Sequence, residues 1–288
     1  MDLRSPLFVL LAVLAGFNAH AQVTTVSELV DAVDNGAEDD VVDIAPGVYT
    51  LTAPLQPKSG MHLRGSGADQ TVITASAKWL PGLDGLPDNA VDHTSVNRSA
   101  YLIDLGDQRQ NVTLSGMTLT GPELHGAVYG NNCDGLTLRG LRFDGFRWSA
   151  VRLFRMDNGR IHDNTFVDAG GRAQVTTGQT GGAVFMTFTR DSELWNNRIL
   201  KTSDHPGNFF GFKGRKATNT RIHHNTVLVG FSLELPFEND LNVERALVVR
   251  VHRSAGELGN RDRPGEVVVI DFHIQVILER QFKGESDQ

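Results

Sequence analysis

The chain has 288 residues, of which 40% are hydrophobic, and a formal net charge of −7 at pH 7. This length and composition are enough for one domain with a sizeable core. The acidic balance and the lack of a basic stripe along the sequence argue against a nucleic-acid-binding surface, so no nucleic-acid partner is expected.

The N-terminus has the three parts of a secretory signal peptide. Arg4 precedes the apolar run PLFVLLAVLAGF, and Ala19-His20-Ala21 has the A-x-A form of a cleavage site. Residues 1–21 are therefore predicted to be a cleavable signal peptide of a secreted or periplasmic protein. An uncleaved anchor is the alternative, but the run is short for a membrane span. No later segment is apolar enough to cross a membrane, so no membrane partner is expected.

The next segment predicts a short helix followed by short strands. VSELVDAVDNG (26–36) has apolar residues at helical spacing and Gly36 as a stop. DVVDIAPGVYTL and SGMHLRGSGADQTVI have the alternation of short strands, and AYLIDLG resumes it. Between them, residues 76–99 are rich in Gly, Pro, Asp and Asn and predict a long loop.

From about residue 100 to 244 the chain repeats itself. RIHDNT (160–165) and RIHHNT (221–226) are near copies, and weaker copies align on a Gly or Asn at each corner: Gly116, Gly140, Asn164, Asn197 and Asn225. A Gly or Asn at a fixed place marks a bend with positive φ. Units of roughly two dozen residues cannot bury their own apolar face and must stack on their neighbours. The repeat therefore predicts a parallel β-solenoid whose open N-terminal end is covered by the helix, with the three Asn residues as a stacked amide ladder.

The chain resembles the right-handed parallel β-helix, or pectin-lyase-like, superfamily over roughly residues 22–244. The resemblance lies in the capping helix, in APGVYTL and HLRGSG, and in the IHDNTF and IHHNTV corners. It implies an all-β, right-handed parallel β-helix that is active on carbohydrates, and we expect a monomer. FFGFKGRKATNTRIHHNTV is also similar to the alginate lyase and chondroitinase B family, with Lys213 or Lys216 at the position of the base. The following coil, LELPFEND, lacks that family's Arg.

The corner alignment predicts which side chains point outward on one face of the stack. Counting back from each corner gives two outward columns: Val128, Arg152, Phe185 and Lys213 in one, and Gly130, Phe154, Thr187 and Arg215 in the other. The intervening residues are assigned to the core: Ala127, Val151, Val184 and Phe212, with Tyr129, Leu153, Met186 and Gly214. Glu234 and Glu238 of the next coil are placed on the same face.

Cations beside aromatic rings suit an acidic polysaccharide, because cations pair with carboxylates and rings stack on sugar C–H surfaces. Lys213, Arg215 and Glu238 are therefore the candidate catalytic residues, with Lys213 as the base of a lyase or epimerase. Arg152, Phe154, Phe185 and Glu234 are the candidate substrate-binding residues. No cofactor is assigned with certainty, and Ca²⁺ stays open because Glu234 and Glu238 would suit it. The alternatives are a solvated charged face and a non-catalytic, truncated or inactive surface or binding protein.

The remaining metal and thiol candidates are weak. His162 and His223 share a column, but Trp195 lies between them, and a separation of roughly 10 Å is too long for one metal ion. No metal site is therefore assigned. Cys133 is the single cysteine and is expected to be a buried thiol.

The last segment, residues 245–288, does not continue the repeat. Val248 stands where the next corner residue is due, and an unbroken β-like run follows at 266–279. We interpret this irregular tail as the product of a disturbed reading frame near residue 244, with a genuine C-terminal cap as the alternative.

Overall fold

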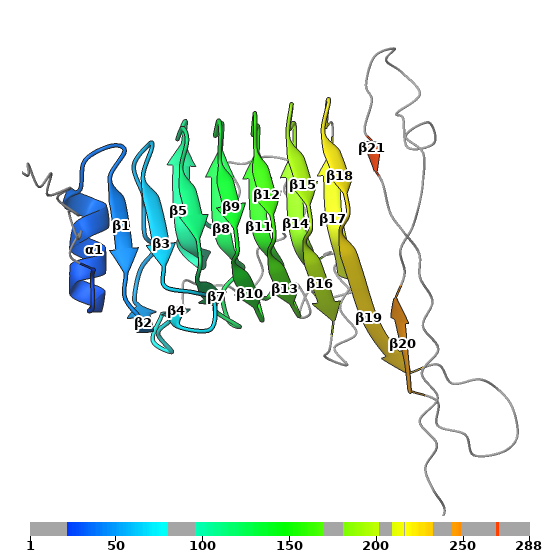
Figure 1. The fold of residues 1–288 in the computed structure, drawn as a ribbon, viewed down its shortest axis with the longest axis horizontal. Helices are drawn as coiled ribbons and strands as arrows, with labels where there is room; N and C mark the ends of the chain where they lie inside the picture. The colour runs from blue at the N-terminus through cyan, green and yellow to red at the C-terminus, as the bar shows by residue number, and fades with distance from the viewer. Residues whose placement is uncertain are drawn as a thin grey trace, which may run out of the picture.

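The computed structural model describes residues 22–79, 96–169, 181–201, 209–215, 217–232, 244–248 and 269–270. Over these residues the chain winds through three sheets whose strands follow one another along a single axis (Figure 1). The predicted signal peptide, residues 1–21, lies outside the described residues.

Each sheet takes one strand from successive coils. The first sheet holds β1 (Val41–Ile44), β3 (His62–Gly65), β6 (Thr113–Ser115), β9 (Thr137–Arg139), β12 (Arg160–His162), β15 (Glu193–Trp195), β18 (Arg221–His223) and β21 (Val269–Ile270). The second holds β2 (Gly47–Leu51), β4 (Thr71–Ala75), β7 (Thr118–Thr120), β10 (Arg142–Asp144), β13 (Thr165–Val167), β16 (Arg198–Lys201), β19 (Thr226–Ser232) and β20 (Glu244–Val248). The third holds β5 (Tyr101–Asp107), β8 (Gly126–Asn131), β11 (Ser149–Phe154), β14 (Gly181–Thr187) and β17 (Phe209–Arg215).

Strands of successive coils pair in parallel and in register, as in Ile161 opposite Leu194 and Val151 opposite Val184. Three parallel sheets wound in this order form a parallel β-helix, which confirms the all-β, parallel β-helix part of the predicted fold class. A right-handed winding is what the strong preference of parallel crossovers leads us to expect. Inward side chains of the three sheets form one core, in which Phe143 and Phe166 stack with ring centroids 4.6 Å apart. Cys133 is buried, as predicted, and burial raises the pKa of its thiol to about 11.

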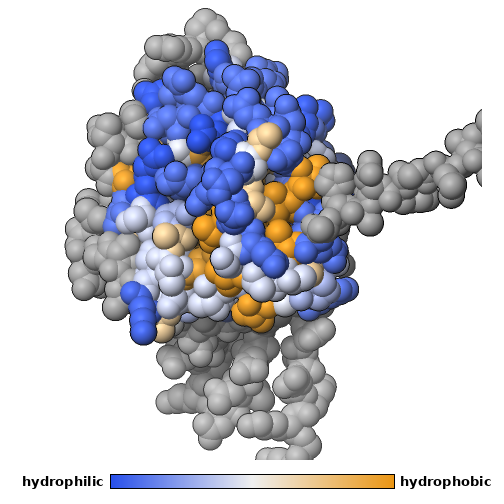
Figure 2. Space-filling view, turned by 90° about the vertical axis from the view of Figure 1, so that its left-hand side faces the viewer, coloured by the Kyte–Doolittle hydropathy of each residue, from blue (hydrophilic) through white to orange (hydrophobic). Residues whose placement is uncertain are grey.

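The predicted helix is α1 (Val26–Asn35), which lies beside β1 at the end of the stack (Figure 1). Leu29 and Val33 are fully buried in the core. Figure 2 looks onto this end and shows apolar surface among polar side chains. In the described part of the chain, the exposed large hydrophobic residues are Val30, Val41 and Val48, so apolar surface of the first coil remains in contact with solvent.

The helix begins with a capping box. The Thr25 hydroxyl accepts a hydrogen bond from the Glu28 backbone N–H, and the Glu28 carboxylate accepts one from the Thr25 backbone N–H. Hydrogen bonds from the backbone and hydroxyl of Thr24 also hold the pKa of Glu28 below its usual value. Because each bond satisfies a donor that the first helical turn leaves open, the box fixes the start of the helix.

We expect Thr25→Ala to lower the free energy of unfolding by about 1 kcal/mol, because the Glu28 N–H loses its acceptor. Urea denaturation measures this change. Val30→Ala, on the exposed side of the same helix, serves as the control and should leave stability within about 0.5 kcal/mol. Equal losses in the two variants would show that the cap does not stabilise the helix.

The corners between the first and second sheets correct the sequence alignment. Gly116 and Gly140 have positive φ, as predicted. In the later coils the residue with positive φ lies one position before the Asn that recurs in the repeat. These residues are Asp163, Asn196 and His224. The structural equivalent of Gly140 is therefore Asp163, since Arg139 pairs with His162. The alignment of Gly140 with Asn164 was wrong by one residue.

The three asparagines instead form the predicted amide ladder. Asn164, Asn197 and Asn225 are buried. The Asn164 Nδ2 group donates to Asn197 Oδ1 at 3.0 Å, and Asn197 Nδ2 donates to Asn225 Oδ1 at 2.9 Å. Because each amide also bonds to backbone groups of the preceding coil, the ladder joins successive coils at this corner.

The three corners differ in how much their length varies. From β6 to β19, two residues always separate a strand of the first sheet from the next strand of the second. Five residues always separate a strand of the third sheet from the next strand of the first, from β5 to β18. Among the coils from β6 to β19, only the connection from the second to the third sheet varies, from residues 145–148 to residues 168–180. The unequal repeat spacings in the sequence therefore arise at a single corner.

The predicted tail begins where the pairing changes. β20 runs antiparallel to β19, whereas every other pairing among the described strands is parallel. Within 245–288, the structure describes only 245–248 and the two residues of β21, which pair with β18. The irregular tail and its origin stay predictions. No helix among the described residues is long and apolar enough to span a membrane.

Candidate functional site

The outward face of the third sheet carries the predicted columns, with one correction. Arg152 pairs with Phe185, and Phe185 with Lys213, as predicted. On the preceding coil, however, Tyr129 and not Val128 is the partner of Arg152. Val128 lies in the main core, and Tyr129 belongs to a separate cluster with Tyr101 and Phe154. The predicted inward place of Tyr129 and outward place of Val128 were wrong because of the one-residue slip at Gly140.

With this correction the two outward columns, which we call the outer columns, run over five coils. The first is Asp104, Tyr129, Arg152, Phe185 and Lys213. The second is Asp107, Asn131, Phe154, Thr187 and Arg215. Gly130, which was predicted to point outward, pairs with the core residue Leu153 and is replaced in its column by Asn131.

A β-bulge in β5 brings two carboxylates to the start of the outer columns. The register between β5 and β8 shifts between Asp104, opposite Tyr129, and Asp107, opposite Asn131. Residues three apart in a regular strand point to opposite faces, whereas the extra residue of a bulge returns them to one face. Gly106 lies in this bulge with φ of +68° and donates its N–H to Asp104 Oδ1 at 2.8 Å.

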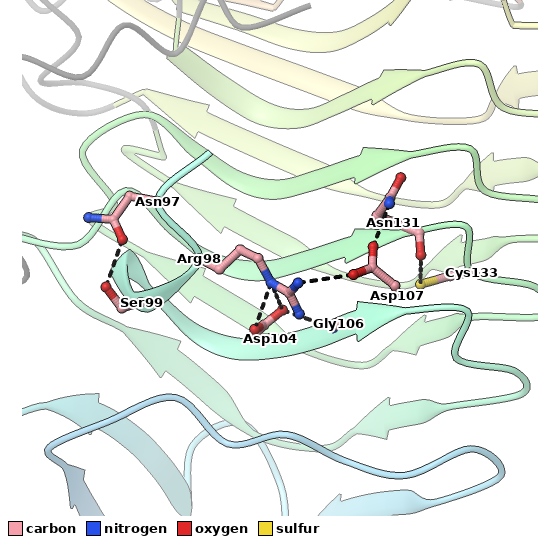
Figure 3. A network of polar contacts seen from close by, with 8 residues as sticks. All are labelled: Asn97, Arg98, Ser99, Asp104, Gly106, Asp107, Asn131 and Cys133. Carbon is pink, nitrogen blue, oxygen red and sulfur yellow. Dashed lines mark hydrogen bonds and ion pairs between the residues drawn. The ribbon is translucent and has the colours of Figure 1, made fainter. Parts of the chain in front are cut away.

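Arg98, from the short 3₁₀ helix η2 (Arg98–Ala100), holds both carboxylates (Figure 3). Its Nε lies 3.0 Å from Asp104 Oδ2, and its Nη1 lies 3.1 Å from Asp107 Oδ2. Burial alone would lower the pKa of Arg98, but its hydrogen bonds to Asp104 and the charges of both carboxylates outweigh burial and raise it. Asn131 Nδ2 donates to Asp107 Oδ1 at 2.5 Å, which continues the network onto the next coil.

We expect Gly106→Ala to lower the free energy of unfolding by more than Gly140→Ala does. Both positions have positive φ, where a Cβ costs about 1 kcal/mol. At Gly106 the added Cβ would also lie 3.0 Å from Arg98 Nη2, whereas at Gly140 its nearest neighbour is 3.9 Å away. Denaturation of the two variants separates backbone strain from the disturbance of Arg98, and equal losses would mean that Arg98 does not constrain the bulge.

In the middle of the outer columns, the guanidinium of Arg152 is enclosed between two aromatic rings. The Arg152 guanidinium carbon lies 3.8 Å from the Phe185 ring centroid and 4.9 Å from that of Phe154. Arg152 has no exposed surface, and Phe154 and Phe185 are 1% and 3% exposed. The sequence thus placed these three residues together correctly, but the structure buries them. Desolvated cation–π contacts of this kind contribute about 2 kcal/mol.

Tyr129 links the enclosed cation to the carboxylate network. Arg98 lies 5.7 Å from the centroid of the Tyr129 ring, which in turn neighbours Phe154 at 6.4 Å. Burial raises the pKa of Tyr129 to about 12, despite the opposing charge of Arg98. Tyr129 is therefore a neutral phenol at physiological pH.

Lys213 and Arg215 complete the outer columns on β17, where they pair in register with Phe185 and Thr187. They lie two residues apart on the same strand. Glu234 and Glu238 lie outside the described residues, and Lys216 lies there too.

Among the described residues there is no group of three or more His, Cys, Asp or Glu side chains placed to hold a metal ion. His162 pairs with Trp195, and Trp195 with His223, which confirms the predicted order of this column. The Ca²⁺ alternative depended on Glu234 and Glu238 and stays a prediction.

Sequence reasoning missed Arg98, Asp104, Asp107, Tyr129 and Asn131. One signal was available: in IDLGD a glycine interrupts a strand between two aspartates, and a strand glycine often marks a bulge. No comparable signal marks Arg98, because it lies outside the repeat and reaches the sheet from a neighbouring turn.

Comparisons with known proteins identify similar structures only. No protein-family model and no curated protein matches the chain. One similar solved structure is a putative glycosyl hydrolase from Parabacteroides merdae ATCC 43184, at 9% identity and a TM-score of 0.47 over 72% of this chain and 89% of that chain. An alginate lyase from Paenibacillus sp. str. FPU-7 has 12% identity and a TM-score of 0.44 over 72% and 65% of the two chains. The surface adhesin PfbA of Streptococcus pneumoniae has 12% identity and a TM-score of 0.38 over 69% and 59%. At these identities and TM-scores none of the three assigns an activity to this parallel β-helix.

Proposed function

We propose that the protein is an exported, carbohydrate-active β-helix that acts on an acidic polysaccharide, as a lyase or an epimerase. The observation that carries this proposal is the register of β14 and β17. It puts Lys213 in the column of Phe185 and Arg152, and Arg215 in the column of Thr187 and Phe154. A linear polymer lying along this face would pass one strand per coil, at intervals of about 4.8 Å, and would reach Lys213 and Arg215 on β17.

The proposed chemistry begins with removal of the proton α to a uronate carboxylate. Neutral Lys213 Nζ accepts this proton, and Arg215 stabilises the enolate that forms. In a lyase the C–O bond to the neighbouring sugar then breaks, an unsaturated uronate forms, and the leaving oxygen takes a proton. In an epimerase the carbon is instead reprotonated from the opposite side. Glu238 stays a candidate acid or base, and Glu234 a candidate substrate ligand.

Arg152 has a revised role in this proposal. It was predicted to pair with a substrate carboxylate, but its guanidinium is fully buried between two rings. We assign it to fixing the ring of Phe185 and to contributing positive charge beneath the face. Phe185, on the neighbouring coil, then supports the position of Lys213, and Phe154 encloses Arg152 from its other side.

The test is incubation of the purified protein with alginate, polygalacturonate and glycosaminoglycans. A lyase produces the ultraviolet absorbance of unsaturated uronates together with new reducing ends, and an epimerase changes the uronate composition measured by NMR. If none of these changes occurs with any polymer, the catalytic proposal is wrong.

The second candidate is a non-catalytic surface or binding protein with the same fold. The burial of Arg152, Phe154 and Phe185 favours it, because these residues expose almost no surface to a ligand. Polysaccharide binding without any chemical change in the polymer would establish this alternative.

The remaining features of the proposal concern the whole molecule. Export rests on the predicted signal peptide, and the protein is proposed to act as a monomer. Burial of Leu29 and Val33 supports a capping role for α1, which would shield the edge of the first coil from other chains.

A further inference from the structure

The outward face of the first sheet carries a second set of aligned side chains, remote from the outer columns. On β12, β15 and β18 the rings of His162, Trp195 and His223 stack on one another. The first two centroids are 4.2 Å apart at 8°, and the last two are 6.3 Å apart at 5°. Because neighbouring rings cover each other's faces, ring edges rather than faces remain at the surface. This arrangement offers few ring faces for stacking on a sugar. The ring nitrogens His162 Nδ1, His223 Nδ1 and His223 Nε2 are engaged by Asp163, His224 and Glu193, so the cations on this face are its arginines.

The residues beside the stack make this face positive. Arg139, Arg160 and Arg221 are exposed on β9, β12 and β18. Two carboxylates lie beside the stack. Glu193 is engaged by His223 at 2.7 Å and by Arg221 at 3.7 Å, and Asp163 is engaged by His162 at 2.7 Å. An acidic protein with a net charge of −7 thus has a locally cationic surface here.

Two of these arginines differ from five other arginines among the described residues. Arg139 and Arg160 lie on adjacent coils and form no ion pair in the described part of the chain. Other arginines do have a carboxylate partner: Arg64, Arg98, Arg142, Arg190 and Arg221. The charge of Arg139 acts on a neighbouring histidine. The pKa of His62 is lowered mainly by burial and, in addition, by the charges of Arg139 and Arg64.

Cations on β9, β12 and β18 match anionic groups repeated along a linear chain. Strands of adjacent coils lie about 4.8 Å apart, so a ligand aligned with the axis meets Arg139 and Arg160 on adjacent coils and Arg221 two coils further on. Arginine forks bind carboxylates and sulfates through paired N–H groups. We propose that this face, defined by Arg139, Arg160, His162, Trp195 and Arg221, is a second, non-catalytic binding surface for an acidic polysaccharide. It shares the class of ligand with the proposed function but uses a different sheet.

The test measures binding of the full chain to immobilised polygalacturonate, with neutral dextran as the reference, at several salt concentrations. We expect the double variant Arg139→Gln/Arg160→Gln to bind at least tenfold more weakly. The slope of log affinity against log salt should also fall by about 2, since two cation contacts are lost. The matched control is Arg142→Gln/Arg190→Gln, which removes the same charge from arginines that are paired with Asp144 and Asp157.

Near-wild-type binding by the control, with weak binding by the first variant, supports the proposal. Equal losses of binding in both double variants would show an effect of net charge and would overturn the proposal. It would also be overturned if Arg139→Gln/Arg160→Gln bound as tightly as the wild type, or if the wild type did not bind polygalacturonate. Thermal unfolding of both variants confirms that they are folded. Polymer cleavage is assayed separately, so an inactive protein that loses binding only in Arg139→Gln/Arg160→Gln would overturn the proposed chemistry and keep the second surface.

Discussion

Replacing Asn197 with alanine is expected to lower the free energy of unfolding by about 4 kcal/mol. The Asn197 amide is the central member of the ladder: it donates to Ile161 O and Asn225 Oδ1, and it accepts from the N–H and Nδ2 groups of Asn164. Asn197 is 1% exposed, so water cannot replace these bonds. Each buried polar group left without a partner costs about 1–3 kcal/mol, and the substitution leaves several.

Chemical denaturation measures this loss, and hydrogen exchange at Asn164 and its neighbours should locate it at the corner. Asn35→Ala is the matched control, because Asn35 is exposed at the end of α1 and bonds only to the Asp31 side chain four residues earlier. That variant should stay within about 0.5 kcal/mol of the wild type. If Asn197→Ala is as stable as the control, the ladder does not hold the coils together.

Lys213→Ala is expected to reduce kcat/KM by at least about 100-fold on whichever acidic polysaccharide the protein converts, because it removes the proposed base. Lys213→Arg separates the two roles of this side chain. An arginine keeps the positive charge but does not give up its proton at neutral pH, so substrate binding should survive while turnover is lost.

Initial rates at several substrate concentrations, with binding measured in parallel, distinguish these outcomes. Lys78→Ala is the control, because Lys78 is exposed on another part of the chain and should retain wild-type rates. A Lys213→Arg variant with wild-type turnover would show that Lys213 supplies charge and not proton transfer, and the base would then have to be sought elsewhere.

Much of the fold could be predicted because the repeat constrains it at many positions. Each coil needs an alternating strand and a tight corner. In the sequence, Asn164, Asn197 and Asn225 mark the corner of each coil and also show which residues of successive coils stack on one another. The alignment failed only where a glycine had to be matched with one of two adjacent residues. Asp163 has the positive φ and Asn164 has the ladder, and the sequence alone does not separate these two roles.

The site was less predictable because it depends on contacts outside the repeat. Arg98 reaches Asp104 and Asp107 from a turn, and the bulge at Gly106 changes which side chains share a face. The burial of Arg152 likewise depends on what lies above the sheet, whereas alternation along a strand gives only the direction of a side chain. The sequence therefore predicted the column of Arg152 correctly and its exposure incorrectly.

Because two corners have a constant length and the third varies, insertions should be tolerated at the third corner only. A residue added between β12 and β13 would displace the ladder, and one added between β11 and β12 would shift the partner of every following strand. Between β10 and β14 the chain already alternates between the short connection 145–148 and the long connection 168–180 without any change in the pairing of the strands on either side. Foreign peptides spliced into the second-to-third corner would therefore emerge at the start of the third-sheet strands, one per coil, without rebuilding the β-helix.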